Sequence, residues 1–180
     1  MTVKGSFVAS EQTTHFGYKT VSEDDKAGLV GDVFDSVASS YDLMNDAMSL
    51  GVHRLWKRQA IASLQLRRGH SVLDLAAGTG DLSRLAVQIV GDAGQVVMTD
   101  INHSMLSGGR DRFLDRGVCQ GLEFLRVNAE HLPFASHSFD RVMIGFGLRN
   151  VTHKEHALKE MYRVLKPGGI AMVLEFSHPT

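Results

Sequence analysis

The sequence is poor in the residues that cross-link or stiffen small proteins. Its 180 residues include one cysteine, Cys119, together with three prolines and one tryptophan. A single cysteine excludes an internal disulfide and a cysteine-rich zinc site, and it is compatible with a reducing compartment. Charges of the two signs nearly cancel, with 19 Lys and Arg against 20 Asp and Glu. No overall basic field therefore favours a nucleic acid or a strongly anionic membrane as partner.

Long apolar runs and targeting signals are missing as well. No run of about 18 apolar residues occurs, so we predict no transmembrane helix. Residues 1–20 have neither the apolar core of a secretory signal nor the arginines of a mitochondrial one. We therefore expect a flexible N-terminal segment over residues 1–28 and a cytoplasmic protein.

The chain does contain enough apolar sequence for one globular core, because 43% of its residues are hydrophobic and 22% are charged. Five apolar segments alternate with helical patterns, at residues 71–75, 95–100, 122–128, 139–145 and 169–176. This alternation is typical of an α/β protein with a doubly wound, mostly parallel sheet.

Three connections between these segments predict amphipathic helices, over residues 82–90, 104–116 and 153–165, and a turn is predicted at residues 166–169. The apolar residues expected to face the sheet are Leu82, Leu85, Ala86, Ile89 and Val90 in the first helix, Leu106, Phe113 and Leu114 in the second, and Ala157, Met161 and Leu165 in the third. We expect residues 71–180 to form the ligand-binding core. Residues 29–70 read as helical segments that could cover the ligand as a lid.

A glycine-rich turn follows the first predicted strand and is the most informative motif. Asp74 lies in the strand, Gly78 and Gly80 lie in the turn, and a helix follows. Glycines allow the backbone to approach a ligand closely, and the first N–H groups of the helix favour an anionic ligand group. Asp100 ends the next strand, 22 positions after Gly78, where a carboxylate can accept hydrogen bonds from ribose hydroxyls. The motif therefore predicts a nucleoside site at the carboxyl ends of the strands.

The spacing of the glycines favours one class of nucleoside. A dinucleotide fingerprint needs a third glycine at position 83, where this chain has Ser83. The order Asp-x-Ala-x-Gly-x-Gly, starting at Asp74, resembles the first motif of class I S-adenosyl-L-methionine (SAM)-dependent methyltransferases, which have a Rossmann-like fold. A dehydrogenase is the weaker alternative.

Several longer motifs resemble one family within that class. They are Thr14-His15-Phe16-Gly17, the stretch from Val33 to Asp42, Met44-Asn45-Asp46, His53-Arg54-Leu55-Trp56-Lys57, and Phe146-Gly147-Leu148-Arg149-Asn150-Val151. Together they are similar to the ubiquinone/menaquinone biosynthesis C-methyltransferase family of bacterial type, over about residues 13–179. Members of this family continue beyond a fifth strand, so the resemblance implies that the last strands of the sheet are missing here and that the chain is a truncated piece whose own activity is an open question.

The resemblance implies the cofactor and its contacts. SAM would lie against the glycine turn, the end of the second strand and the loops after the third and fourth strands. The implied contact residues are Asp74, Gly78, Thr79, Gly80, Asp100, Ile101, Asn128, Ala129 and Gly145. Gly145 stands where related sequences carry a serine, and Ala76 stands where glycine is common.

The resemblance also implies the reaction, which is methylation of a ring carbon in a reduced, prenylated quinone precursor. Arg149 and Asn150 are the candidates that stabilise or orient the acceptor oxygen, and Tyr41 is a candidate hydroxyl in the substrate pocket. For Arg149 the alternative is a structural ion pair with Asp42 or Asp46. His53 is a weaker candidate for the base.

Other functions are less well supported. An exocyclic-amine methyltransferase usually carries a Pro-Pro motif after the fourth strand, and this chain has no Pro-Pro, so we expect no nucleic-acid substrate. His153 and His156 could form a metal-binding pair, but no carboxylate or cysteine cluster accompanies them in the sequence, and we expect no metal. The cationic and aromatic residues 53–58 suggest peripheral contact with the inner face of a membrane. Another small-molecule O- or N-methyltransferase, an inactive SAM-binding fragment and a homodimer stay open.

Overall fold

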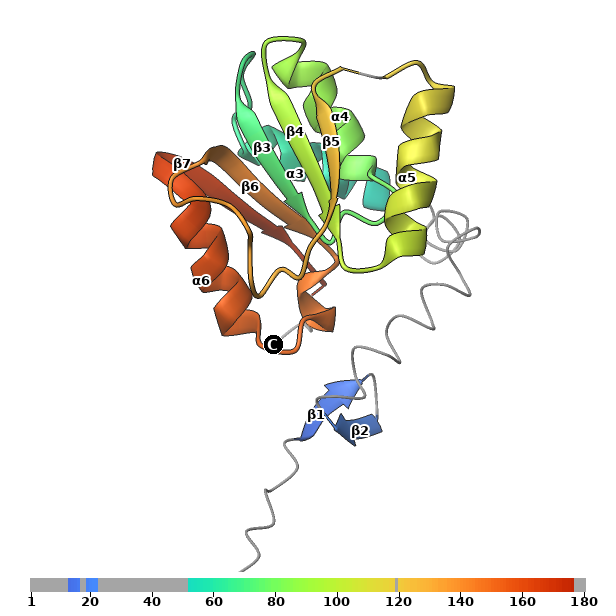
Figure 1. Ribbon diagram of the computed structural model, residues 1–180, viewed down its shortest axis with the longest axis vertical. Helices are drawn as coiled ribbons and strands as arrows, with labels where there is room; N and C mark the ends of the chain where they lie inside the picture. The colour runs from blue at the N-terminus through green and yellow to red at the C-terminus, as the bar shows by residue number, and fades with distance from the viewer. Residues whose placement is uncertain (1–12, 17–18, 23–51, 119, 177–180) are drawn as a thin grey trace, which may run out of the picture.

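The computed structural model describes residues 13–16, 19–22, 52–118 and 120–176. At its centre is a parallel sheet in the strand order β5-β4-β3-β6-β7 (Figure 1). The strands are β3 (Ser71–Leu75), β4 (Gln95–Asp100), β5 (Leu122–Arg126), β6 (Phe139–Gly145) and β7 (Leu165–Leu174). The chain starts in the middle of the sheet, builds outwards to β5 and then returns to β6. This is the predicted doubly wound, Rossmann-like arrangement, which is confirmed.

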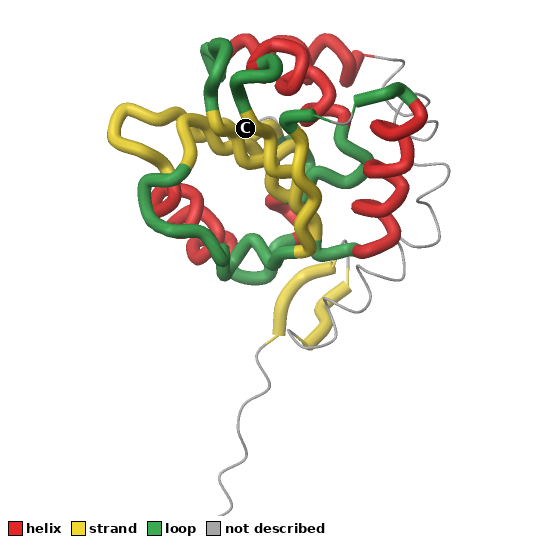
Figure 2. Tube along the Cα trace, turned by 45° about the horizontal axis from the view of Figure 1, so that its top comes forward, coloured by secondary structure: helices red, strands yellow, loops and turns green. Residues whose placement is uncertain are grey.

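Helices cover both faces of the sheet (Figures 1 and 2). Buried side chains of α3 (Val52–Ser63) and α4 (Asp81–Val90) share one apolar cluster with the strand residues that point to their face of the sheet, such as Val72. Helix α5 (His103–Asp115) continues this layer beside β4 and β5. Helix α6 (Lys154–Val164) and the loop before β6 cover the opposite face. None of the helices within the described ranges has both the length and the apolar character needed to cross a membrane.

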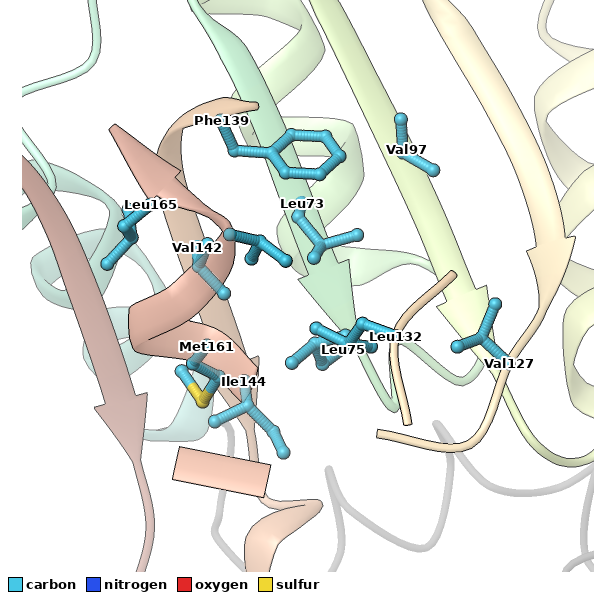
Figure 3. Close-up of a cluster of buried hydrophobic side chains, with 11 residues drawn as sticks. Leu73, Leu75, Val97, Val127, Leu132, Phe139, Val142, Ile144, Met161 and Leu165 are labelled. Atoms are coloured by element: carbon cyan, nitrogen blue, oxygen red, sulfur yellow. The ribbon is translucent and has the colours of Figure 1, made fainter. Parts of the chain in front are cut away.

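The face covered by α6 holds the largest single cluster of buried apolar side chains among the described residues (Figure 3). Leu73 and Leu75 of β3 project to this side together with Val142 and Ile144 of β6, and Met161 of α6 packs against them. These five side chains are at most 1% exposed. Successive residues of a strand point to opposite faces of the sheet. Because consecutive strand residues are buried here, both faces of the sheet must be covered.

The N-terminal part is described only as a short antiparallel hairpin, in which β1 (Thr13–Phe16) pairs with β2 (Lys19–Ser22). The sequence analysis did not predict this hairpin within the segment expected to be flexible. Tyr41, Asp42, Asp46 and most of the predicted lid lie outside the described residues. Of that lid segment, residues 52–70 are described, and Ala60 and Ile61 of α3 are buried in the core together with Leu64, which follows the helix.

Element boundaries agree with the predicted ones except at two strands. Strand β5 ends at Arg126 rather than Asn128, because Val127 already turns into the loop towards the cavity described below. Strand β7 begins at Leu165, which pairs with Phe139, but Arg141 pairs with Ile170. The predicted turn at residues 166–169 is therefore a bulge inside β7. The predicted sheet-facing positions Ile89 and Leu114 are wrong, since these side chains are 39% and 53% exposed.

Helix α5 packs closely on the glycine turn through Gly109. A Cβ atom at this position would lie 2.5 Å from Met98 Cε and 3.2 Å from the Gly78 carbonyl oxygen. Gly108, the neighbouring residue in the same helix, has no heavy atom within 4 Å of its would-be Cβ. Only the glycine at 109 is therefore required for the helix to reach the turn.

Asp74 is a buried carboxyl in β3 that holds the start of α4. Its Oδ2 atom accepts a hydrogen bond from the Ser83 hydroxyl at 2.6 Å, and the Ser83 backbone N–H also donates to it. Gly80, the residue that caps α4, has no side chain to do this. Asp74 Oδ1 is buried and has no hydrogen-bond partner among the residues that the structure describes, and burial raises the pKa of the Asp74 carboxyl to about 7.

The two glycines of α5 provide a matched test of this packing. We expect Gly108→Ala to stabilise the protein by about 0.5–1 kcal/mol, because alanine favours the helix. Gly109→Ala should destabilise it by about 1 kcal/mol, because overpacking against Met98 and the turn outweighs the same gain. Urea unfolding measures both, and equal stabilisation by the two substitutions would contradict the close approach of α5 to the turn.

The buried Asp74 predicts a pH dependence of stability. Its pKa is higher in the folded state than its ordinary value of 3.8, so the folded protein binds this proton more tightly. The resulting stabilisation is complete below pH 4 and is lost as the pH rises through 7. We expect Asp74→Asn to gain unfolding free energy relative to the parent chain between pH 4 and pH 8, by up to about 4 kcal/mol. Urea titrations across this range test it, and a difference that does not change with pH would argue against the raised pKa.

Candidate functional site

A cavity of about 430 Å³ opens at the carboxyl ends of β3, β4, β5 and β6. The residues that line it come from the four loops that follow these strands. From the predicted site they include Gly78, Asp100, Ile101, Asn128, Ala129, Gly145 and Asn150. The structure thus brings these predicted residues together at the carboxyl ends of the strands. Ligands of doubly wound sheets bind at this edge, as the sequence analysis expected.

Asp100 is the best-defined polar group of the cavity. Its Oδ2 accepts the Gly78 N–H and its Oδ1 accepts the Asn102 N–H, both at 2.8 Å. The residue is 8% exposed, and burial raises the pKa of its carboxyl, although these backbone N–H groups act in the opposite direction. Each carboxylate oxygen can accept more than one hydrogen bond. The carboxylate is therefore held in place while it keeps acceptor capacity for a hydroxyl-bearing ligand.

The glycine turn joins this cavity to a smaller recess. The recess is lined by residues from α3, β3, the turn, α4 and the end of β6, and these are Lys57, Asp74, Ala76, Ala77, Gly78, Thr79, Asp81, Leu82, Gly145 and Phe146. Four of these, Ala76, Gly78, Gly145 and Phe146, also line the larger cavity. Thr79 and Asp74, both predicted as cofactor contacts, thus belong to the recess. Gly80 lies behind the turn, where its would-be Cβ meets Phe113 at 2.7 Å.

Lys57 is the residue of this region that sequence reasoning missed. Its ammonium group lies 2.6 Å from Asp81 Oδ2. Burial acts to raise the pKa of Asp81, but the charge and hydrogen bond of Lys57, together with the charges of Arg84 and Arg112, lower it overall. The signal was present in the His-Arg-Leu-Trp-Lys motif, but the sequence does not show which residue of a helix faces the turn.

Two residues with side chains adopt left-handed backbone conformations at the cavity. Ala76, directly after β3, has φ 48°, and Phe146, directly after β6, has φ 58°. Such conformations cost free energy in residues other than glycine, and they cluster at functional sites. Both residues line the cavity and the recess, so the strain lies where the two strands meet the ligand site.

Gly145 stands where the resemblance implies a serine in related sequences. The side chain of Leu82 occupies the space next to it. A Cβ at this position would lie 2.6 Å from Leu82 Cδ1. Leu82 of α4 therefore occupies the volume that a serine side chain would need, and the backbone of Gly145 remains exposed to both cavities.

The loop after β5 forms the opposite wall. Asn128 Oδ1 accepts the N–H of Glu130 at 3.0 Å, which fixes the turn that presents Ala129 to the cavity. This turn places a polar amide and a small apolar residue side by side, as a flat heteroaromatic ring requires.

Two of the three candidate catalytic residues, Arg149 and Asn150, lie in the loop after β6, in the short helix η1 (Leu148–Asn150). Asn150 lines the cavity, whereas Arg149 does not. The Arg149 guanidinium pairs with Glu175 and lies 5.9 Å and 5.6 Å from the ring centres of Phe146 and Phe176. Arg149 therefore forms an ion pair with Glu175, whereas the pairs considered with Asp42 or Asp46 are not tested, because those two residues lie outside the described residues. The side chain of His53 is not described either.

The sequence showed no carboxylate or cysteine cluster beside His153 and His156, but the fold brings one carboxylate, that of Glu130, next to them. Glu130 Oε2 lies 2.8 Å from His153 Nδ1, and potential ligand atoms of the three residues lie within 4.8 Å of one another. Glu130 Oε1 accepts the N–H groups of Thr152 and His153, so the carboxylate caps the start of α6. Its use as a cap gives it a structural role, and the expectation of no metal stays a prediction.

Comparison with known proteins gives consistent matches. The chain matches the ubiE/COQ5 methyltransferase family over residues 19–180. A relative from Pseudoalteromonas translucida (strain TAC 125), named ubiquinone/menaquinone biosynthesis C-methyltransferase UbiE, is 60% identical over 94% of this chain and 67% of its own length. A relative of the same name from Pseudomonas savastanoi pv. phaseolicola is 61% identical over 95% of this chain and 67% of its own length. The chain therefore spans about two thirds of the length of these curated relatives.

Two solved structures support the same fold. A chain of the complex that contains the Haloferax volcanii Trm112 methyltransferase activator aligns with a TM-score of 0.68 and 28% identity, over 80% of this chain and 59% of that one. A SAM-dependent methyltransferase from Aquifex aeolicus, at 21% identity and a TM-score of 0.60 over 65% of this chain and 62% of its own, shares the fold. With a family match over residues 19–180 and relatives about 60% identical, the chain belongs to the ubiE/COQ5 methyltransferase family.

Proposed function

We propose that the chain binds SAM in the cavity and that it is a C-methyltransferase of ubiquinone or menaquinone biosynthesis, or of both. Its acceptor would be a ring carbon of a reduced, prenylated quinone precursor. The observation that carries the proposal is the buried Asp100 carboxylate, held by the Gly78 N–H of the glycine turn, in a chain about 60% identical to relatives named for this activity.

The residues present fit SAM. Asp100 can accept hydrogen bonds from ribose hydroxyls, and the turn at Asn128 and Ala129 can hold the adenine. The cavity volume of about 430 Å³ is within the range for small-molecule sites. When bound, SAM supplies an activated methyl group, so activation of the acceptor is left to the protein.

The acceptor needs an ionised hydroxyl next to the reacting carbon. A phenol with a pKa of about 10 is only about 0.1% ionised at pH 7, which corresponds to roughly 4 kcal/mol. A cation or hydrogen-bond donor fixed near that oxygen lowers this cost, and its effect is larger away from water. We propose that Asn150 binds the acceptor oxygen from within the cavity and that Arg149, adjacent in η1, supplies the positive charge at the rim.

Asp100 provides the first test of cofactor binding. Hydrogen bonds to a charged group contribute about 1.5–3 kcal/mol, so Asp100→Asn should weaken SAM binding by roughly 10- to 100-fold. Calorimetric titration measures this, with NAD as a second ligand. Asp140→Asn is a matched control, because Asp140 also accepts a backbone N–H, that of Ser71, but at the opposite end of the sheet. Unchanged SAM affinity in Asp100→Asn, or saturable NAD binding, would refute the assignment.

Arg149 provides a test of the transfer step. We expect Arg149→Ala to lower the rate of methyl transfer to a reduced demethylated quinone at least ~100-fold, as for loss of one group that stabilises a developing oxyanion. The affinity for SAM should change less than about threefold, because Arg149 does not line the cavity. Arg116→Ala, an exposed position after α5, is the control.

The assay should offer benzoquinol and naphthoquinol acceptors in parallel and identify the methylated atom. Turnover of the Arg149→Ala variant equal to that of the parent chain would remove Arg149 from the mechanism. A product methylated on oxygen or nitrogen would favour a different small-molecule methyltransferase.

A further inference from the structure

Lys57 is an unusual lysine because its side chain is largely buried at the ligand site. The side chain is 12% exposed, whereas the neighbouring Leu55 and Trp56 of α3 are 63% and 41% exposed. Lysine side chains are rarely buried without a partner for the charge. Asp81 is that partner within the described residues, at 2.6 Å.

The pair lies on the far side of the glycine turn from Asp100. Asp81 is the first residue of α4 and follows the turn directly. Because Gly78 lines the cavity and the recess alike and donates its N–H to Asp100, one ligand can reach both. An adenosine whose ribose is bound at Asp100 would direct its 5′ substituent along the turn towards Lys57.

The charges of the recess select the kind of substituent it can accept. Among the described residues that line it, Lys57 is the only cation, and Asp81 lies beside it as an anion. A pyrophosphate carries two negative charges, so one lysine paired with a carboxylate would leave it repelled by Asp81. An α-amino acid carries one positive and one negative charge, and it therefore complements a lysine and an aspartate that lie side by side.

We propose that Lys57 binds the α-carboxylate of the amino-acid end of the cofactor, and that this contact is the main reason why the site prefers an adenosine with an amino-acid tail. The inference rests on the proposed SAM site but names a residue that this proposal does not require. In the absence of ligand, Asp81 holds the lysine at the recess. When the ligand binds, its carboxylate becomes a second acceptor for the same ammonium group, which has three N–H donors.

An ion pair that merely fastens α3 to α4 would give the same geometry, and α3 does pack on α4. The two roles differ in their consequences. A purely structural pair changes the stability of the protein and affects all adenosine ligands alike. A carboxylate-binding lysine affects only ligands that carry the carboxylate.

The experiment compares two ligands that differ by one group. S-adenosylhomocysteine and its decarboxylated analogue, 5′-deoxy-5′-(3-aminopropylthio)adenosine, share the adenosine, the sulfur and the amine. In calorimetric titrations of the 180-residue chain we expect S-adenosylhomocysteine to bind roughly 10- to 100-fold more tightly, as for one hydrogen-bonded ion pair. In Lys57→Met this ratio should fall below about threefold, because only S-adenosylhomocysteine loses affinity.

Lys166→Met is the matched control. Lys166 also pairs with an aspartate, since its Nζ lies 2.9 Å from Asp140 Oδ2, but it lies at the opposite end of the sheet and should leave the ratio unchanged. Lys57→Arg should restore part of the preference, because it keeps the charge. Thermal melting of each variant shows whether it is folded, and Lys57→Gln is the second variant if Lys57→Met is not.

The outcomes separate the two proposals. Equal loss of affinity for both ligands in the Lys57 variants would overturn the inference and leave a structural ion pair. A ratio near one in the parent chain would also overturn it, while SAM binding itself stands. No binding of either ligand by the folded parent chain would refute the cofactor proposal, and the inference would fail with it.

Discussion

The hydrogen bond from the Gly78 N–H to the Asp100 carboxylate connects the two loops on which the site depends. It joins the end of β3 to the end of β4, and the adjacent Ala77 N–H donates to the Thr99 carbonyl at 2.9 Å. The turn is therefore fixed to the neighbouring strand before any ligand arrives. A ligand that binds Asp100 does not have to order the turn, so less conformational entropy is lost on binding.

The same turn is also stabilised by Ser83 and Gly109, which line neither the cavity nor the recess. Ser83 donates its hydroxyl to Asp74, and Gly109 brings α5 within contact of the Gly78 carbonyl. A glycine at position 83, as in a dinucleotide fingerprint, would lack the hydroxyl that Asp74 accepts. In this chain a buried hydrogen bond between Ser83 and Asp74 therefore takes the place of the close packing of a glycine at position 83. Burial raises the pKa of the Asp74 carboxyl.

Two charged pairs lie near Phe146. Lys57 and Asp81 lie at the recess that Phe146 lines, and the Arg149 guanidinium, which pairs with Glu175, lies 5.9 Å from the centre of the Phe146 ring. The Phe146 ring also stacks on Phe176 at 4.7 Å between ring centres. Phe146 itself adopts a left-handed conformation directly after β6. The strained residue therefore lies near both the region proposed for the cofactor tail and the charge proposed for the acceptor oxygen, and a change in its backbone would affect both.

The sequence by itself determined the sheet, the glycine turn and the position of Asp100. Strands β3, β4 and β6 match the predicted ranges, because a buried parallel strand needs a continuous apolar run that is visible locally. Ile89 and Leu114 were misplaced because helical periodicity gives the apolar face but not its width. Only the tertiary structure decided the pairs Lys57–Asp81, Arg149–Glu175 and Glu130–His153, whose members are 23 to 26 positions apart. These contacts depend on the order in which strands cross over and on which residue of a helix faces the sheet, and neither is encoded in local periodicity.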